Sequence, residues 1–193
     1  MSALVVVQHG GKERGPGDPG LTHLGRRQAV AAAEALASLR PATVASSPLL
    51  RAQQTAEPLC TAIGLTPRID ARLLERINLE PDADPTRFLS DWARSTGDRT
   101  WIPPGGRSSI ATASEMRAAI DEYACDERTV VLFGHGGATI DLLRSLLGDE
   151  ELRRRRPRLL IAGPPGGSLT GLRRDEAGPW HVTSIAEPPR PRS

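Results

Sequence analysis

Two short apolar runs, far apart in the chain, each end in a histidine followed by glycine. The first, at residues 5–10, places His9 after three valines and a glutamine, and the second, at residues 130–137, places His135 after Val-Val-Leu-Phe-Gly. Continuous runs of this kind are typical of strands buried on both faces of a parallel sheet. Ligands bind at the carboxyl ends of such strands. We therefore expect the two histidines to share one site, built from both ends of the sequence.

The composition limits the kinds of partner that the chain can have. Its 193 residues are the length of one ordinary domain. The 25 basic and 23 acidic residues give a net charge of +2, whereas a nucleic-acid-binding domain usually carries a strongly basic stripe. One Tyr and two Phe also leave little aromatic surface on which bases can stack. We therefore expect no nucleic-acid partner.

The apolar segments and the cysteines of the chain indicate its cellular compartment. No stretch approaches the ~20 apolar residues of a membrane span, and the apolar run at residues 3–7 is too short for a signal peptide. Cys60 and Cys125 lie far apart and match no metal or redox spacing. These features predict a cytoplasmic protein with no membrane contact, no metal site and two structural thiols.

Strand and helix patterns alternate along the chain. Besides the two opening runs, strands are expected at residues 43–47, 67–69, 159–161, 168–172 and 181–185. Helices are expected at residues 26–39, 48–63, 86–94, 108–124 and 138–147. This order predicts an α/β fold, a three-layer α/β/α sandwich with a mostly parallel central sheet. One domain is expected over residues 1–186, followed by a disordered Pro- and Arg-rich tail over residues 187–193.

Four ionisable residues are candidates for chemistry: His9, Arg51, Glu75 and His135. Arg51 falls in the first turns of a helix that follows a strand, so it can point into the cleft at the same sheet edge. Alone, Arg51 or Glu75 would be interpreted as a solvated surface side chain. Together with two histidines at strand ends, they indicate a catalytic site.

The motifs around these residues resemble those of the histidine phosphatase superfamily, which includes cofactor-dependent phosphoglycerate mutases and many small phosphatases. Members typically carry Arg-His-Gly after the first strand, a Leu-Thr…Gly…Gln-Ala helix start, Ser-x-x-x-Arg-Ala-x-x-Thr-Ala, Leu-x-Glu and Ser-His-Gly-Gly. The matching segments are residues 8–10, 21–29, 47–56, 73–75 and 134–137. The resemblance covers about residues 4–185 and implies a phosphoglycerate mutase-like fold.

This resemblance implies phosphoryl transfer without a metal or cofactor. His9 would be the nucleophile that forms a phosphohistidine, and Glu75 would protonate the leaving alcohol and then activate water. Arg51 and Gly136 at a helix start would hold the phosphate oxygens. His135, the third catalytic residue, would donate a hydrogen bond to the same group, and protonation would make it a better donor as charge develops. The implied activity is a phosphomonoester hydrolase, a phosphatase acting on a small phosphorylated metabolite.

Position 8 departs from the family pattern. Gln8 keeps hydrogen-bond donors for phosphate but lacks the charge of the family's arginine. One such donor is worth about 3 kcal/mol, or a hundredfold in rate. Two interpretations of the next loop stay open. Either Lys12 or Arg14 folds back over the cleft and restores the charge, or both are solvated loop residues.

Gln8 also supports a second function, that of a catalytically weakened or inactive relative that binds a phosphorylated ligand or partner as a regulator. The presence of both a nucleophile and a general acid argues against it. Nucleotide binding of the Rossmann type is disfavoured because the segment directly after the first strand is not Gly-x-Gly-x-x-Gly, and the chain has no Walker-type Gly-Lys-Ser/Thr. Mutase activity is less expected, since the chain is short and Gly15 stands near the position of the mutases' asparagine. A homodimer is only a family-level expectation.

Residues 76–104 are expected to form the wall that selects the substrate, whose identity the sequence leaves open. Its large side chains are Arg87, Trp92, Arg94, Arg99 and Trp101, some of which could contact a substrate tail. For Trp92, helical spacing from Phe88 favours a core position instead. The arginines at 153–156 follow three acidic residues at 149–151, so their charges are expected to pair on a solvated face.

Overall fold

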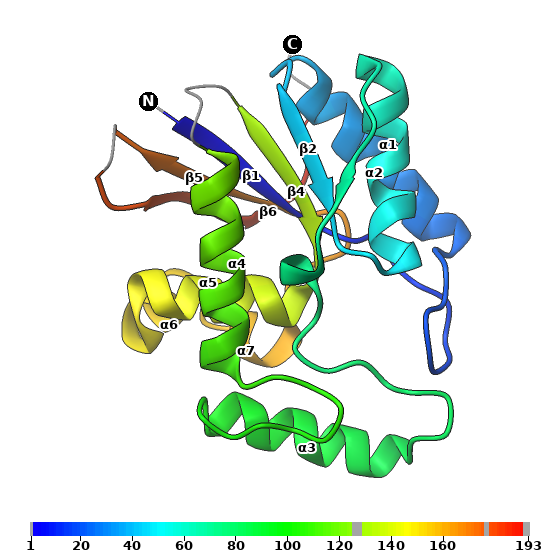
Figure 1. Cartoon of the computed structure of the whole chain (residues 1–193), viewed down its shortest axis with the longest axis vertical. Helices are drawn as coiled ribbons and strands as arrows, with labels where there is room; N and C mark the ends of the chain where they lie inside the picture. Colours follow the sequence, from blue (N-terminus) through cyan, green and yellow to red (C-terminus); the bar gives the residue numbers. More distant parts are fainter. Residues whose placement is uncertain (1, 125–128, 176–177, 191–193) are drawn as a thin grey trace.

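Six strands form one mixed sheet in the order β3-β2-β4-β1-β5-β6 (Figure 1). The computed structural model describes residues 2–124, 129–175 and 178–190. Its strands are β1 (Ser2–Gln8), β2 (Thr43–Ser46), β3 (Arg68–Ile69), β4 (Val130–Gly134), β5 (Leu169–Arg174) and β6 (His181–Glu187). β1 pairs in parallel with β4, β4 with β2 and β2 with β3, whereas β5 is antiparallel to both β1 and β6. The mostly parallel sheet predicted from the sequence is confirmed.

Helices cover both faces of this sheet. They are α1 (His23–Ala37), α2 (Leu50–Ile63), α3 (Pro85–Gly97), α4 (Ser109–Tyr123), α5 (Gly136–Leu147), α6 (Asp149–Arg155) and α7 (Leu159–Ala162), with a 3-10 turn η1 (Ala71–Leu73). Residues of α1 and α2 pack on one face, and residues of α4 and α5 pack on the other. The result is the expected three-layer α/β/α sandwich (Figure 1).

The central strand β4 shows why its sequence is an unbroken apolar run. Val131 and Phe133 pack against α1 and α2, while Val130 and Leu132 pack against α4 and α5. Successive side chains of a strand point to opposite faces, so a strand covered on both sides is apolar at every position. The middle of β1, the strand that ends just before His9, follows the same rule: Leu4 and Val6 pack on one face, and Val5 and Val7 on the other.

The loop after β1 is held against the start of α1. Thr22 is the N-cap of α1, and its Oγ1 accepts a hydrogen bond from the N–H of Gly25 at 2.9 Å. A Cβ on Gly10 would collide with the carbonyl group of Gly25, and a Cβ on Gly25 would collide with Gly11. Only glycines allow this close backbone approach, and it fixes the chain that leaves His9.

The sequence predicts a strand over residues 159–161, and that prediction is wrong: the segment belongs to the short helix α7. Three apolar residues carry no period that separates a strand from a helix. Only Leu159 of this run is buried, whereas Ile161 is 90% exposed. Gly163, with a φ of +70°, ends the turn.

Helix α6 is not among the helices expected from the sequence. Its first turn is acidic and its last turn is basic, which suits the helix dipole. Arg153 pairs with Asp149, and Arg154 and Arg155 both pair with Glu151. The predicted pairing of these charges on a solvated face is therefore confirmed.

Strand β6 runs one residue past the expected end of the domain. Glu187, assigned from the sequence to a disordered tail, pairs with Leu169 of β5 and forms an ion pair with Arg156. These contacts explain why it is ordered as part of the strand. Residues 191–193 of the tail, and Cys125, lie outside the described residues.

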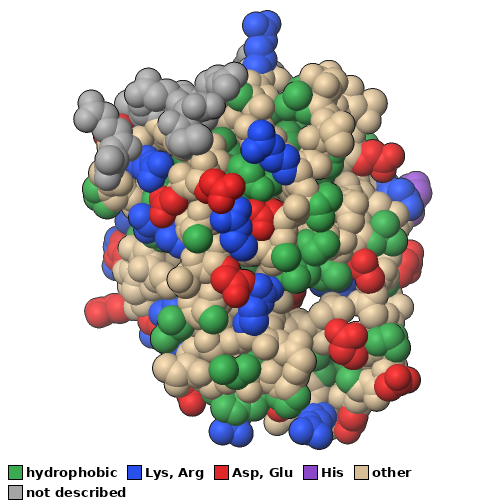
Figure 2. Space-filling model, in the orientation of Figure 1, with side chains coloured by type: hydrophobic (Ala, Val, Ile, Leu, Met, Phe, Trp, Pro, Cys, Tyr) green, Lys and Arg blue, Asp and Glu red, His purple; other side chains and the backbone are tan. Residues whose placement is uncertain are grey.

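Helix α3 lies apart from the layers, at the end of the molecule toward which the carboxyl ends of β1, β2 and β4 point (Figure 1). On the face in Figure 2, basic and acidic side chains are interspersed rather than gathered by sign. Within the described ranges, no helix combines the length and apolar character that crossing a membrane requires.

Candidate active site

A cavity of about 300 Å³ brings together residues that lie far apart in the sequence. His9, Lys12, Arg51 and Glu75 all line it. A larger depression of about 640 Å³, lined by residues of α2 and the segment up to Pro67, contains none of the predicted catalytic residues. Chemistry rather than size therefore marks the smaller cavity as the candidate site.

His9 follows the last residue of β1 and is held in one orientation. Its Nδ1 lies 2.7 Å from the carbonyl oxygen of Gly10, which can only accept, so Nδ1 carries the proton. Burial lowers the pKa of His9 to about 4, against the effect of the Gly10 carbonyl, and the charges of Arg51 and Lys12 lower it further. At neutral pH the imidazole is uncharged and Nε2 has a free lone pair.

His135 lies beside His9, with the two ring centroids 5.3 Å apart. Its Nε2 lies 2.7 Å from Ser47 Oγ. Ser47 Oγ accepts from the N–H of Leu49, so its hydroxyl proton can be donated to Nε2, and the imidazole proton then resides on Nδ1. That buried Nδ1 has no hydrogen-bond partner in the described part of the chain.

The family resemblance implies that His135 donates a hydrogen bond to phosphate and that protonation would strengthen it, but the free protein does not favour the protonated form. Burial lowers the pKa of His135 well below its ordinary value, and the charges of Arg51, His9 and Arg107 act in the same direction. A neutral imidazole with its proton on Nδ1 is still a donor. Its contribution to anion binding is then a neutral hydrogen bond instead of a charged one.

Arg51 occupies the second position of α2 and is only 3% exposed. Its Nη2 donates to Asn78 Oδ1 at 3.2 Å, and its Nη1 lies 3.6 Å from the Asp18 carboxylate. Asp18 also accepts from the N–H of Leu50 at the start of α2. Within the described residues, the buried Nε and Nη1 of Arg51 make no hydrogen bond. A guanidinium with two such donors is suited to bind an anion.

Glu75 is held by backbone at the start of α5. Its carboxylate accepts from the N–H groups of Arg76, Gly137 and Ala138 at 2.9–3.0 Å. Burial nevertheless raises the pKa of Glu75, against the lowering effect of these hydrogen bonds and of the nearby Arg76 and Arg51 charges. A carboxyl group with a raised pKa holds its proton more readily than an ordinary carboxyl group, which suits a general acid.

Two N–H groups at the start of α5 therefore bind the Glu75 carboxylate, whereas the family resemblance gives the start of this helix only a role in phosphate binding. Gly136 begins the helix, and a Cβ there would lie 3.0 Å from Pro164 and 3.5 Å from Gln8 Oε1. A Cβ on Gly137 would collide with the Glu75 carboxylate and lie 2.7 Å from the ring of Trp92. Glycine at 137 is thus required for this arrangement.

Gln8, the residue that departs from the family pattern, is fixed through its backbone. Its N–H donates to the Ser168 carbonyl and its carbonyl accepts from the N–H of Gly167. Its side-chain oxygen is buried, next to the Gly136 backbone, and lacks a hydrogen-bond partner among the described residues. An amide can present either its oxygen or its NH₂ at such a position.

Lys12 lines the cavity, as one of the two interpretations of its loop requires. Burial and then the Arg51 charge lower the pKa of Lys12, and the Lys12 charge in turn acts on His9. Lys12 and Arg14 are both exposed, but Arg14 is not among the cavity-lining residues. Of the two candidate cations, Lys12 is the one placed at the site.

Sequence reasoning misses several residues that shape the site. Asp18 and Asn78 position Arg51, yet they belong to no pattern that distinguishes them from ordinary loop residues. Ser47, the first residue of the 47–56 motif, contacts His135, a role that the motif does not reveal. Trp92 is predicted to be core, but it is half-buried and lines the cavity. Helical spacing from Phe88 shows only that both lie on one face of α3, and that face covers the site.

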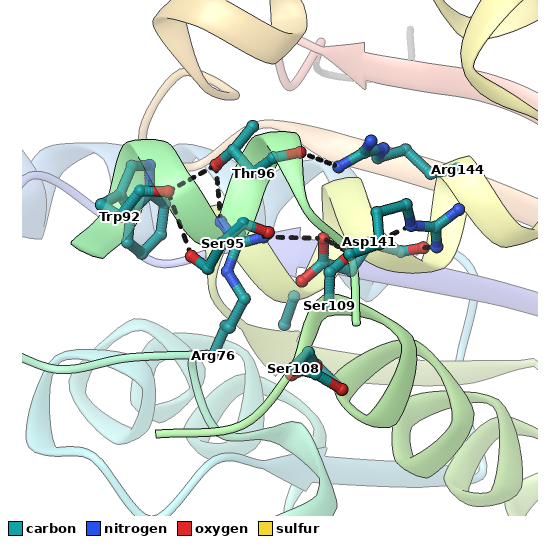
Figure 3. A network of polar contacts seen from close by, with 12 residues as sticks. Arg76, Trp92, Ser95, Thr96, Ser108, Ser109, Asp141 and Arg144 are labelled. Atoms are coloured by element: carbon teal, nitrogen blue, oxygen red, sulfur yellow. Dashed lines mark hydrogen bonds and ion pairs between the residues drawn. The ribbon is translucent and has the colours of Figure 1, made fainter. Parts of the chain in front are cut away.

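A buried polar network fixes α3 next to the site (Figure 3). The Arg76 guanidinium pairs with the Asp141 carboxylate at 3.1 Å and stacks on the ring of Trp92, 4.7 Å from its centroid. Asp141 also accepts from Ser109 Oγ of α4 at 2.6 Å. Burial raises the pKa of Asp141 to about 6, against the lowering effects of Arg76 and Ser109.

The family model described as "Histidine phosphatase superfamily (branch 1)" matches residues 4–186. The chain belongs to the histidine phosphatase superfamily. Among its relatives is the glucosyl-3-phosphoglycerate phosphatase of Mycobacterium tuberculosis, 35% identical over 169 residues, or 75% of this chain and 74% of the relative.

Solved structures of this superfamily agree with the architecture. The native structure of the mycobacterial glucosyl-3-phosphoglycerate phosphatase has a TM-score of 0.74 at 29% identity, covering 97% of this chain and 99% of that one. A structure of the same phosphatase with inorganic phosphate has a TM-score of 0.73 at 30% identity, covering 95% and 96%. The phosphoglycerate mutase-like α/β fold implied by the sequence motifs is confirmed.

Proposed function

We propose that the chain is a phosphomonoester hydrolase that transfers a phosphoryl group to His9 and then to water. The observation that carries the proposal is one cavity lined by His9, Arg51 and Glu75, in which Gly10 holds His9 as the neutral Nδ1–H tautomer. Relatives named as phosphatases support the same reaction class.

In the first half-reaction, the lone pair of His9 Nε2 attacks phosphorus and the bond from phosphorus to the leaving oxygen breaks. Protonated Glu75 gives its proton to that oxygen, so the product leaves as a neutral alcohol. In the second, Glu75 takes a proton from water, whose oxygen attacks phosphorus while the P–N bond breaks. Inorganic phosphate and neutral His9 result.

The phosphate oxygens need donors, because phosphoryl transfer is catalysed mainly by positioning and charge stabilisation. Arg51 offers its Nε and Nη1 and His135 offers its Nδ1, none of which makes a hydrogen bond among the described residues. Gln8, at the end of β1, lies next to the backbone of Gly136, which follows β4 at the same edge of the sheet. We assign these groups to phosphate binding, on a small phosphorylated metabolite as substrate.

Lys12 is proposed as the cation that offsets the missing arginine at position 8. Lys12→Ala is expected to lower kcat/KM at least about tenfold, because one charged donor at such a site contributes more than that. Arg14→Ala is the matched control, since Arg14 is a cation of the same loop outside the cavity. Gln8→Arg is expected to restore activity to Lys12→Ala. Equal effects of the two loop variants would show that Lys12 is only solvated.

The function is tested by phosphate release from a panel of phosphomonoesters, without added metal. Wild type is expected to turn over at least one ester, and His9→Ala to lose that activity. His181→Ala is the matched control because His181 is an exposed histidine in β6. Turnover that survives in His9→Ala would contradict the mechanism.

The uncharged Gln8 favours a second candidate, a weakened relative that binds a phosphorylated ligand or partner as a regulator. This alternative predicts that inorganic phosphate or vanadate binds and that Arg51→Ala abolishes the binding, while no ester is hydrolysed. Binding without turnover would select it over the hydrolase.

A further inference from the structure

Beyond its charged end, the cavity has an apolar wall. Five apolar side chains line it: Ile77, Leu79, Phe88, Leu89 and Trp92. They come from two places, the segment that follows Glu75 and the inner face of α3. An apolar wall contributes to binding by removing apolar ligand surface from water.

The wall is fixed before any ligand arrives. Arg76 donates to the Ser95 carbonyl at 3.2 Å and to Thr96 Oγ1 at 3.0 Å, and Arg144 donates to the Thr96 carbonyl at 2.9 Å. Figure 3 shows these contacts converging on α3 from below and from the side of Asp141. The stacking of Arg76 on Trp92 sets the plane of the indole ring.

The charges around the cavity leave no partner for a second anionic group. Its ionisable lining residues are His9, Lys12, Arg51 and Glu75, and the proposed reaction uses the two cations for phosphate. A carboxylate or second phosphate on the leaving group would face the apolar wall or Glu75. Burying an unpaired anion is strongly unfavourable.

One depression next to the cavity has an excess of acidic residues. This depression shares Ile77, Asn78 and Phe88 with the cavity. Its charged lining residues are four acidic ones, Glu80, Asp82, Asp84 and Asp91, and one basic one, Arg87, which pairs with Asp91. A substrate whose tail extends in that direction meets negative charge, which opposes an anionic tail.

We propose that the cavity selects phosphomonoesters whose leaving alcohol is uncharged and presents a flat apolar face to Trp92. Trp92 and Leu89 are then specificity-determining residues. This inference rests on the proposed function, because it assigns the leaving-group side of the same site.

The test compares two esters that share one ring, benzyl phosphate and 4-carboxybenzyl phosphate. Wild type is expected to show a kcat/KM at least about tenfold higher for benzyl phosphate, since an unpaired carboxylate in an apolar site is worth more than this. Equal values, or a preference for the carboxylate, would overturn the inference.

Two pairs of variants test whether residues of the apolar wall cause the preference for an uncharged leaving group. Trp92→Ala is expected to raise KM for benzyl phosphate about tenfold with a smaller change in kcat, whereas Trp101→Ala is expected to change neither. Trp101 is the matched control because Arg94 stacks on it at 4.4 Å, and it lies outside the cavity. Equal KM changes in the two variants would overturn the role of Trp92.

Leu89→Arg provides a variant that is expected to fold, because Leu89 is 66% exposed. Adding a cation there is expected to raise kcat/KM for 4-carboxybenzyl phosphate by about tenfold. Ile102→Arg, at a residue with the same 66% exposure outside the cavity, is expected to leave it unchanged. Identical behaviour of the two arginine variants would overturn the assignment of Leu89.

The two levels of the proposal fail separately. Turnover of both esters that His9→Ala abolishes supports the hydrolase mechanism even if wild type shows no preference, and that result overturns only the specificity inference. Absence of turnover of any phosphomonoester by wild type overturns both.

Discussion

Removing the Asp141 carboxylate is expected to cost stability out of proportion to a single ion pair. Asp141 is fully buried, and Arg76, which pairs with it, is 3% exposed. Asp141→Ala leaves the guanidinium without its anion and Ser109 Oγ without its acceptor. Breaking a buried pair from one side costs about 3–5 kcal/mol, because an uncompensated charge stays behind. For a domain stable by about 5–15 kcal/mol, that is a large share.

The loss is measured by urea unfolding at a pH well above about 6, the pKa of Asp141, so that the group is ionised in wild type. With equal slopes, the change in midpoint gives the change in free energy of unfolding. Glu122→Ala is the control, since Glu122 pairs with Arg72 but is 63% exposed, and an exposed pair contributes about 0–1 kcal/mol. A loss in Asp141→Ala no larger than in this control would refute the reasoning.

Three further predictions concern the site and the element that supports it. Burial lowers the pKa of His9 from 6.5 to about 4, so kcat/KM is expected to fall with acid only below about pH 4. The contribution of His9 to the free energy of unfolding is present above pH 6.5 and is lost as the pH falls toward 4. A pH–rate profile with its acid limb near 6.5 would contradict this. Gly137→Ala is expected to displace Glu75 and Trp92 and to lower kcat about a hundredfold in steady-state assays. An unchanged kcat would contradict the close approach of Glu75 and Trp92 to the backbone at position 137. Thr22→Ala is expected to lower the free energy of unfolding by about 1 kcal/mol through loss of the α1 cap, and an unchanged denaturation midpoint would argue against that cap.

The layers of the fold were predictable from the sequence because burial on both faces leaves an unmistakable pattern. The apolar runs before His9 and His135 identify central strands, and their carboxyl ends share one sheet edge by the rules of parallel sheets. Short segments were not predictable in this way. Residues 159–161 carry too few apolar positions to reveal a period, so a helical turn resembles a strand.

The chemistry of the site was predictable to the extent that motif residues carry it. The motifs name Arg51 and Glu75, and the structure places both at the cavity with His9. What holds those side chains depends on contacts between segments far apart in the chain, such as Glu75 with the start of α5. Trp92 shows the remaining difficulty, since one apolar face of a helix can cover a core or a cavity.

The most direct test of the account is to trap the covalent intermediate. Wild type is mixed with a rapidly hydrolysed phosphomonoester and quenched with alkali, because phosphohistidine is labile to acid. The account predicts phosphate on the peptide that contains His9, and none in His9→Ala. Turnover in wild type with no phosphate on His9, or with phosphate on another residue, would contradict it.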